Sequence, residues 1–161
     1  MGVELDQATI DHLHSGCAVL IGTVSDANIP RASRGSGITV VDAAAAIVRV
    51  LVETDDPVTL ANLAANGRVA ITTADVRTLY SMQFKGTLIA FEECTDADHA
   101  KAEQYRHDFL TDIKETDHIP MELLRGWADR PIAPCLVALH ESFDQTPGPQ
   151  AGSALNRRES P

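Results

Sequence analysis

The sequence predicts a mainly β protein with flanking helices, in which six antiparallel strands form a barrel. Three observations lead to this fold class. The chain has 161 residues, which suits a single domain. It is 44% hydrophobic and 22% charged, an ordinary globular composition. About six short apolar segments follow one another between turn residues, with three helical segments among them, and such a succession fits a barrel with helices on its outside.

The first quarter of the chain predicts a helix followed by two strands. Apolar residues recur at near-helical spacing over residues 5–14, and Gly16 is a natural residue just past a helix end. Residues 17–24 form an apolar, strand-like run. Turn residues at 25–30 then lead into a second strand over residues 31–41.

The next elements are a third strand, a second helix and a fourth strand. Residues 47–53 are rich in β-branched side chains, which favour strands. Asp55-Asp56-Pro57 is a helix start, because Asp caps free amides and Pro is tolerated at the first helical position. Gly67 ends that helix, and a fourth strand begins at Arg68.

Residues 78–92 predict a long fifth strand with two chemically different faces. Its apolar side chains alternate with polar ones, and Gly86 is a candidate β-bulge. The two sets are Met82, Phe84 and Leu88 against Ser81, Gln83, Lys85 and Thr87.

The longest helix is predicted over residues 95–114, and the last strand over residues 136–140, after Pro131 and Pro134. The apolar stripe of this helix is Ala102, Tyr105, Phe109 and Ile113. The Pro- and Gly-rich end predicts a disordered tail over residues 150–161, which leaves residues 1–149 as the domain.

Charge and cysteine usage exclude several classes of function. A formal charge of −10 argues against binding nucleic acid or an anionic membrane, since such binding depends on neutralising phosphates. The first twenty residues lack a basic start followed by an apolar run, so we expect a cytoplasmic protein. Cys17, Cys94 and Cys135 are odd in number and far apart, which predicts neither a disulfide framework nor a metal site.

Two segments are candidate ligand contacts. Residues 30–37 combine two arginines, two serines and two glycines with no acid, which suits a phosphate, although a solvated turn would read the same way. Gln83 and Lys85 suit the polar edge of a flavin ring, although they equally fit the wet face of a barrel strand. A six-stranded barrel has no interior cavity, so a large ligand would lie in an outer groove, where two subunits meet.

Three segments together resemble the pyridoxamine 5′-phosphate oxidase-like, FMN-binding split-barrel family. They are Pro30-x-x-Ser33-Arg34, residues 59–69 and residues 80–86. The resemblance implies a split barrel and a homodimer with FMN at the interface between its subunits. Carried over to this chain, it implies that the cofactor-binding residues are Arg31, Ser33, Arg34, Thr54, Gln83 and Lys85. It assigns no catalytic acid or base.

The chain also departs from that family. Pyridoxamine phosphate oxidases have a Ser-Arg-Lys phosphate clamp where this sequence has Pro57-Val-Thr59, and a different C-terminal segment. The sequence therefore predicts an FMN-binding oxidoreductase acting on a small molecule other than pyridoxamine phosphate. Two alternatives remain open, a deazaflavin-dependent reductase and a non-catalytic flavin or haem carrier on the same scaffold.

Overall fold

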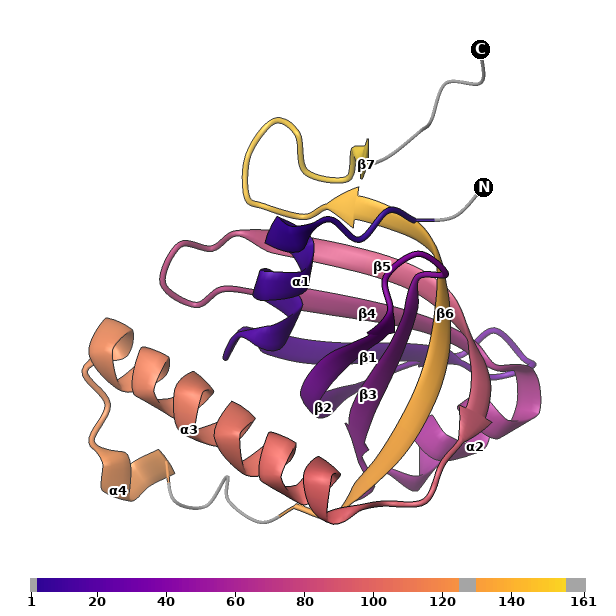
Figure 1. The fold of residues 1–161 in the computed structure, drawn as a ribbon, viewed down its shortest axis with the longest axis horizontal. Helices are drawn as coiled ribbons and strands as arrows, with labels where there is room; N and C mark the ends of the chain where they lie inside the picture. Colours follow the sequence, from indigo (N-terminus) through magenta and orange to yellow (C-terminus); the bar gives the residue numbers. More distant parts are fainter. Residues whose placement is uncertain (1–2, 125–129, 156–161) are drawn as a thin grey trace.

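The structure is a computed structural model that describes residues 3–124 and 130–155. Six antiparallel strands lie in the order β3-β2-β1-β4-β5-β6, and pairing of β3 with β6 closes them into a barrel (Figure 1). The predicted six-stranded antiparallel split barrel with flanking helices is confirmed. The barrel strands are β1 Ala18–Val24, β2 Pro30–Asp42, β3 Ile47–Glu53, β4 Arg68–Ala74, β5 Ser81–Phe91 and β6 Ile132–Asp144.

The alternation of each strand separates a filled interior from an outer face. In β1, Val19 and Ile21 are buried, whereas Leu20 between them is 51% exposed. Strand β4 repeats the pattern, with Val69 and Ile71 buried. Because side chains alternate with a period of two, the intervening residues of β1 and β4 face outward together.

The helices begin and end where the local chemistry predicts. Helix α1, Gln7–His14, is capped by Asp6, whose carboxylate accepts from the amide of Thr9 at 2.8 Å. Helix α2, Pro57–Asn66, is capped by Asp56 and ends at Gly67 with φ of 68°. An Asp cap satisfies free amides, and glycine adopts the left-handed conformation without a Cβ penalty.

Helix α3, Asp96–Asp117, lies across the barrel and presents its predicted apolar stripe to the core (Figure 1). A capping box between Thr95 and Asp98 starts it. A one-turn helix that the sequence did not predict, α4 Met121–Leu124, follows. No helix in the described part of the chain is both long enough and apolar enough to cross a membrane.

The end of the chain differs from the prediction in two respects. Strand β6 starts at Ile132, before Pro134. The pairing of β6 with β5 ends at Cys135, so the N–H that Pro134 lacks is not needed for that pairing. A short strand from the tail, β7 Ala154–Leu155, pairs with β6 at Ser142 and Phe143. Residues 156–161 of the predicted disordered tail lie outside the described residues.

The predicted bulge at Gly86 is confirmed by a register shift between Lys85 and Gly86.

Candidate functional site

A row of small residues crosses the outer face of the barrel. Ala32 on β2 lies opposite Gly22 on β1, and Gly22 lies opposite Ala70 on β4. The same row continues through Lys85 on β5 to Glu141 on β6. Residues directly opposite each other in an antiparallel sheet point to the same face. Three neighbouring positions with a hydrogen or a methyl group therefore leave a trough in this face.

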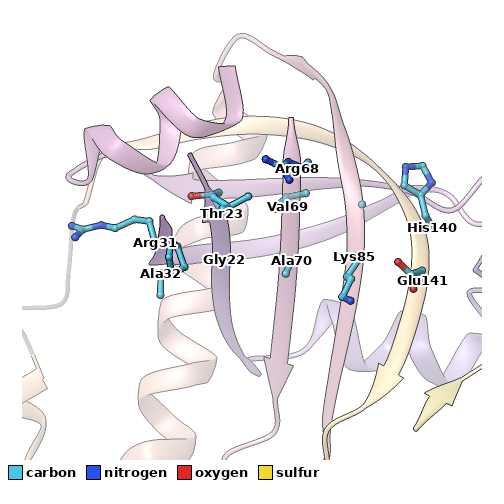
Figure 2. A pocket seen from close by; sticks show the side chains of 13 residues that line it. Gly22, Thr23, Arg31, Ala32, Arg68, Val69, Ala70, Lys85, His140 and Glu141 are labelled. Carbon is cyan, nitrogen blue, oxygen red and sulfur yellow. The ribbon is translucent and has the colours of Figure 1, made fainter. Parts of the chain in front are cut away.

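This trough is the floor of an open groove of about 730 Å³ (Figure 2). Five strands contribute to it, and its lining is largely apolar, with one threonine, four charged residues and one imidazole among it. The lining residues are Gly22, Thr23, Val24, Pro30, Arg31, Ala32, Arg68, Val69, Ala70, Lys85, Gly86, His140 and Glu141. A largely apolar cleft with a few polar groups is the usual form of a small-molecule site.

Two cations stand on the β4 and β5 side of the groove. Arg68 lies opposite Thr87, and Lys85 lies opposite Ala70, so the two cations are diagonal neighbours on one face. The Lys85 ammonium is 4.8 Å from the ring centroid of Phe143. No ion pair joins either cation to a carboxylate among the described residues, although Glu141 lies opposite Lys85 on the same face.

Arg31, in contrast, is already paired. Its Nε donates to the Asp56 carboxylate at 2.6 Å, and Figure 2 shows the side chain extending away from the other labelled groups. The hydrogen bond from Arg31 lowers the pKa of Asp56, and further bonds from Thr59 and Val58 act in the same direction. Arg31 therefore lines the groove with a charge that Asp56 neutralises.

Acidic residues gather at the start of α2, where the resemblance places a phosphate clamp. Arg130 pairs with Asp55 and lies 3.8 Å from the Glu53 carboxylate. Together with Asp56 and Arg31 these residues line a smaller cavity of about 200 Å³. Its lining charges nearly balance, so it lacks the strongly basic character expected of a phosphate site.

Three further predicted residues do not line the groove, although Ser33 and Arg34 line the smaller cavity beside it together with Arg31. Ser33 is opposite the buried Ile21, and its hydroxyl is buried without a hydrogen-bond partner among the described residues. The Arg34 guanidinium lies 5.6 Å from the ring centroid of Phe109. Thr54 donates its hydroxyl to the carbonyl of Pro131 at 3.3 Å. Their assignment to a cofactor stays a prediction.

Gln83 lies on the row next to the trough, on the same outer face as Lys85. It is opposite Thr72, which lies opposite Leu20, and its amide donates to the Thr72 hydroxyl at 3.0 Å. Leu20 in turn lies opposite Arg34, so Arg34 is on the same row. Of the six predicted site residues, Arg31 and Lys85 line the groove, and Gln83 and Arg34 are on the row next to its floor.

Sequence reasoning did not single out four contributors to the groove, namely Gly22, Ala70, Arg68 and His140. His140 lies on β6, with its Nε2 atom 3.0 Å from the Thr87 hydroxyl. Gly22 and Ala70 are small residues at outward-facing positions of their strands, and this feature could have been found in the sequence. The pairing of these two strands, which about forty residues separate along the chain, was needed to place them in one row.

The three cysteines lie outside the groove. Burial raises the pKa of Cys17 to about 11 and that of Cys135 to about 12, so both stay protonated and inert. Exposed Cys94 has its Sγ atom 3.5 Å from Nε2 of His99. Within residues 3–124 and 130–155, no group of three or more His, Cys, Asp or Glu side chains could hold a metal ion.

Comparison with known proteins identifies the fold. No protein-family model matches the sequence, and no curated protein matches it. HupZ of Group A Streptococcus is 18% identical with a TM-score of 0.56, covering 91% of this chain and 98% of HupZ. A pyridoxamine 5′-phosphate oxidase candidate from Lactobacillus delbrueckii is 17% identical with a TM-score of 0.53, covering 87% and 93%. An FMN-binding protein of Syntrophomonas wolfei is 10% identical with a TM-score of 0.52, covering 86% and 87%.

An F420 reductase also shares the fold, at 14% identity and a TM-score of 0.51 over 82% of this chain and 93% of the reductase. Proteins related to pyridoxamine 5′-phosphate oxidases and FMN-binding proteins are thus among the solved structures with this fold. That agrees with the resemblance carried by the three sequence segments. At these identities the likeness establishes the fold, and the ligand has to be argued from the groove itself.

Proposed function

We propose that this protein binds a flavin, in the first place FMN, in the outer groove and acts as a flavin-dependent oxidoreductase. The observation that carries the proposal is the trough formed by Ala32, Gly22 and Ala70. A planar ring system needs a flat, apolar floor that side chains do not obstruct. Three adjacent small residues on three paired strands supply such a floor.

The polar edge of a flavin ring would meet Gln83. A Gln amide can donate and accept, as the alternating donors and acceptors of that edge require. In the structure this amide already donates to Thr72 at 3.0 Å, a contact that fixes its position beside the trough. We assign to Gln83 the orientation of the ring.

The phosphate of FMN would be held by Arg68 and Lys85. Charge-assisted hydrogen bonds to phosphate are roughly twice as strong as neutral ones. The composition of residues 30–37 favoured Arg31 and Arg34 for this role, but the charge of Arg31 is compensated by Asp56 at 2.6 Å. Arg68 and Lys85 are diagonal neighbours facing the groove, and the one carboxylate in its lining, Glu141, lies opposite Lys85 without forming an ion pair with it.

Two copies of the chain would share the groove. The groove is open, and Leu20, which is 51% exposed, lies beside it on the same face. A second copy packed on this face would bury Leu20 and turn an open groove into a closed pocket. Bound flavin supplies the hydride chemistry, and this chain would orient the ring, hold the phosphate and exclude water.

The experiment is a titration of the purified protein with FMN and with riboflavin, which lacks the phosphate, followed by absorbance and fluorescence. We expect FMN to bind more tightly than riboflavin. Replacing both cations, in the double variant Arg68→Gln, Lys85→Gln, should weaken FMN binding by about tenfold or more and leave the affinity for riboflavin unchanged. Gly22→Val fills the trough and should weaken the binding of both flavins. Arg77→Gln, an arginine paired with Asp112 far from the groove, is the matched control.

A protein that binds neither flavin at micromolar concentration would refute the proposal. Equal loss of FMN binding in the Arg77→Gln control would show that the effect of the two groove cations is not local. The same titration with F420 tests the deazaflavin alternative, since an F420 reductase has this fold.

A second candidate ligand is haem, and His140 favours it. The imidazole lies at the β6 side of an apolar groove whose other lining includes Arg68 and Lys85. Imidazole is a common axial ligand of haem iron, and two cations suit its carboxylates. Haem titration should give a shifted Soret band that His140→Ala abolishes. A spectrum identical to that of free haem would exclude this candidate.

A further inference from the structure

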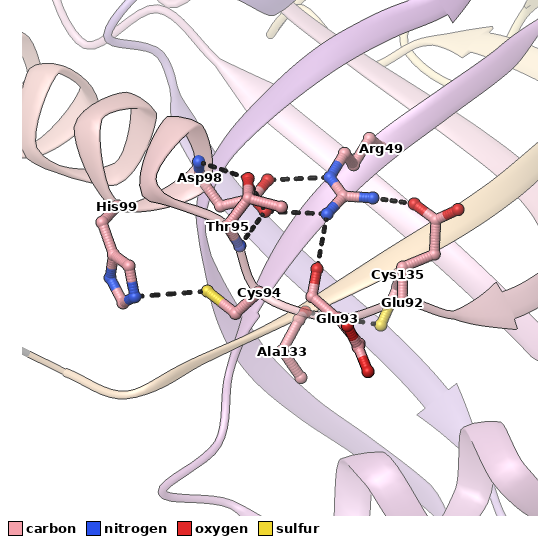
Figure 3. Close-up of polar contacts among 9 residues, drawn as sticks. All are labelled: Arg49, Glu92, Glu93, Cys94, Thr95, Asp98, His99, Ala133 and Cys135. Atoms are coloured by element: carbon pink, nitrogen blue, oxygen red, sulfur yellow. Dashed lines mark hydrogen bonds and ion pairs between the residues drawn. The ribbon is translucent and has the colours of Figure 1, made fainter.

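An exposed thiol and an imidazole lie in contact where the chain enters α3 (Figure 3). The Sγ atom of Cys94 is 3.5 Å from Nε2 of His99, and neither residue lines the groove. In the tautomer that carries its proton on Nδ1, the imidazole can accept the thiol proton at Nε2. A thiol with a base in contact is an arrangement that activates cysteine as a nucleophile.

The backbone on both sides of Cys94 is fixed, although its side chain is exposed. On one side, Arg49 donates to the carbonyl of Glu93 at 3.1 Å. On the other side, a capping box begins α3 at Thr95. His99 follows in the first turn of the helix, where its backbone N–H donates to the carbonyl of Thr95 at 3.2 Å. The backbone therefore holds the thiol and the imidazole near each other, which favours proton transfer between them.

The other two cysteines differ from Cys94. The chain has three cysteines, and all of them lie in the described part of it. Cys17 and Cys135 are 2% and 1% exposed, and burial keeps both thiols protonated and out of reach of a reagent. Cys94 is therefore the cysteine that a reagent can reach in the folded protein.

The charges around Cys94 limit what it can react with. Arg49 pairs with Glu92 and Asp98, so its positive charge is compensated. Several carboxylates lie close to the thiol along the chain, in a protein whose formal charge is −10; they are Glu92, Glu93, Asp96 and Asp98. Such surroundings repel a negatively charged reagent and admit a neutral or cationic one.

We propose that Cys94 is a site of reversible mixed-disulfide formation with small disulfides that carry no negative charge. The Cys94 sulfur attacks one sulfur of the disulfide, while Nε2 of His99 takes the thiol proton. A new S–S bond to Cys94 forms and the S–S bond of the reagent breaks. The other half of the reagent leaves as a thiolate, which takes the proton from the imidazolium. The Cys94 sulfur is thereby oxidised and the leaving sulfur is reduced. This site does not require that the protein be a flavoprotein.

The test is the rate at which the full chain reacts with cationic cystamine, neutral hydroxyethyl disulfide and anionic dithiodipropionate, followed by mass spectrometry. We expect a single adduct at Cys94, which Cys94→Ser abolishes and dithiothreitol reverses. With the neutral disulfide, His99→Gln should lower the rate by about tenfold or more. His107 is an exposed histidine on the same helix, with Nδ1 3.3 Å from Asp108. His107→Gln is therefore the matched control and should leave the rate unchanged.

The charge preference is measured as the ratio of the rates with cystamine and with dithiodipropionate. Dividing this ratio by that of N-acetylcysteine amide, a thiol on an uncharged molecule, removes the intrinsic difference between the two reagents. We expect the corrected ratio for Cys94 to be about ten or more.

Three results would each overturn the proposal. They are an adduct that forms equally in Cys94→Ser, an unchanged rate in His99→Gln, and a corrected ratio of rates that does not exceed that of the reference thiol. Equal slowing in His99→Gln and His107→Gln would also overturn it, since the effect would not come from the imidazole beside the thiol. Because His99 is exposed, His99→Gln should melt at the temperature of the parent protein, so that a slower reaction reports the lost base.

Discussion

At the scale of single residues, the contact between Arg49 and Asp98 fixes α3 to the barrel. Arg49 on β3 donates to both carboxylate oxygens of Asp98 at 2.7 Å, and it also pairs with Glu92 and donates to the carbonyl of Glu93 (Figure 3). The hydrogen bonds from Arg49 hold the pKa of Asp98 far below its usual range, helped by the capping bonds from Thr95. Asp98 is 5% exposed, so this pair is shielded from water.

Removing one partner of this buried pair should destabilise the folded protein. We expect Asp98→Ala to lower the free energy of unfolding by about 3 kcal/mol, because Arg49 loses its buried bidentate partner and keeps only the half-exposed Glu92 and the carbonyl of Glu93. Denaturant unfolding measures the loss. Thr95→Ala, which removes the cap and one hydroxyl bond to Asp98 but keeps the ion pair, should cost about 1 kcal/mol. If Asp98→Ala costs no more than the cap, the pair behaves as an exposed ion pair and this interpretation is wrong.

At the scale of an element, α1 is held to the barrel by neutral histidines. Nε2 of His14 accepts the backbone N–H of Val40 at 2.9 Å, and it can do so only when that nitrogen carries no proton. Burial and nearby Lys101 lower the pKa of His14, while Asp11 opposes them. His12, 2.9 Å from the Thr73 hydroxyl, also has a pKa lowered by burial, with Asp75 opposing.

This arrangement predicts an acid-sensitive fold. Both folded pKa values lie below the unfolded value of about 6.5, so the unfolded chain takes up protons first as the pH falls. The contribution is complete above about pH 6.5 and is lost as the pH falls toward the lowered folded values. Thermal melting between pH 7.5 and 5, above most carboxylate titrations, should show falling stability. The profile of a His12→Gln, His14→Gln double variant should be flatter, and an equally steep one would contradict this account.

At the scale of the whole molecule, the outer face of β1, β4 and β5 is the surface on which we propose that two copies meet. Leu20 on this face is 51% exposed. We expect Leu20→Glu to convert a dimer into a monomer, because a buried, unpaired carboxylate at the interface is costly. Light scattering coupled to size-exclusion chromatography measures the mass. Ile89, also 51% exposed but beyond the Gly86 bulge on β5, provides the control Ile89→Glu, which should leave the dimer intact.

The proposals of a dimer and of flavin binding are tested independently. A parent protein that is monomeric at micromolar concentration would remove the shared-groove arrangement and leave flavin binding to be tested on its own. A dimer that Leu20→Glu leaves intact would place the interface on another face of the barrel.

Local chemistry determined where the elements of this protein begin and end. Asp56, Pro57 and Gly67 bound α2 as predicted, because a capping side chain, a fixed φ and a left-handed glycine act over a few neighbouring residues. The apolar stripe of α3 and the bulge at Gly86 were readable for the same reason. Strand β6 was predicted too short, because proline usually breaks a strand, and the sequence does not show that the pairing with β5 ends beside Pro134.

The tertiary structure alone decided which residues share the groove. The sequence drew attention to Arg31, Ser33 and Arg34 by their composition, but composition does not say which way a strand residue points or what neutralises its charge. Asp56, twenty-five residues farther along the chain, compensates Arg31.

The sequence by itself thus determined the class of barrel, the approximate positions of its six strands and the ends of α2, because those depend on local chemistry and periodicity. Register between strands that are distant in sequence placed Gly22, Ala70 and Ala32 in one row, and it set Arg68 beside Lys85. A slip of one residue would turn each of these side chains to the opposite face, so only the closed barrel specifies the site.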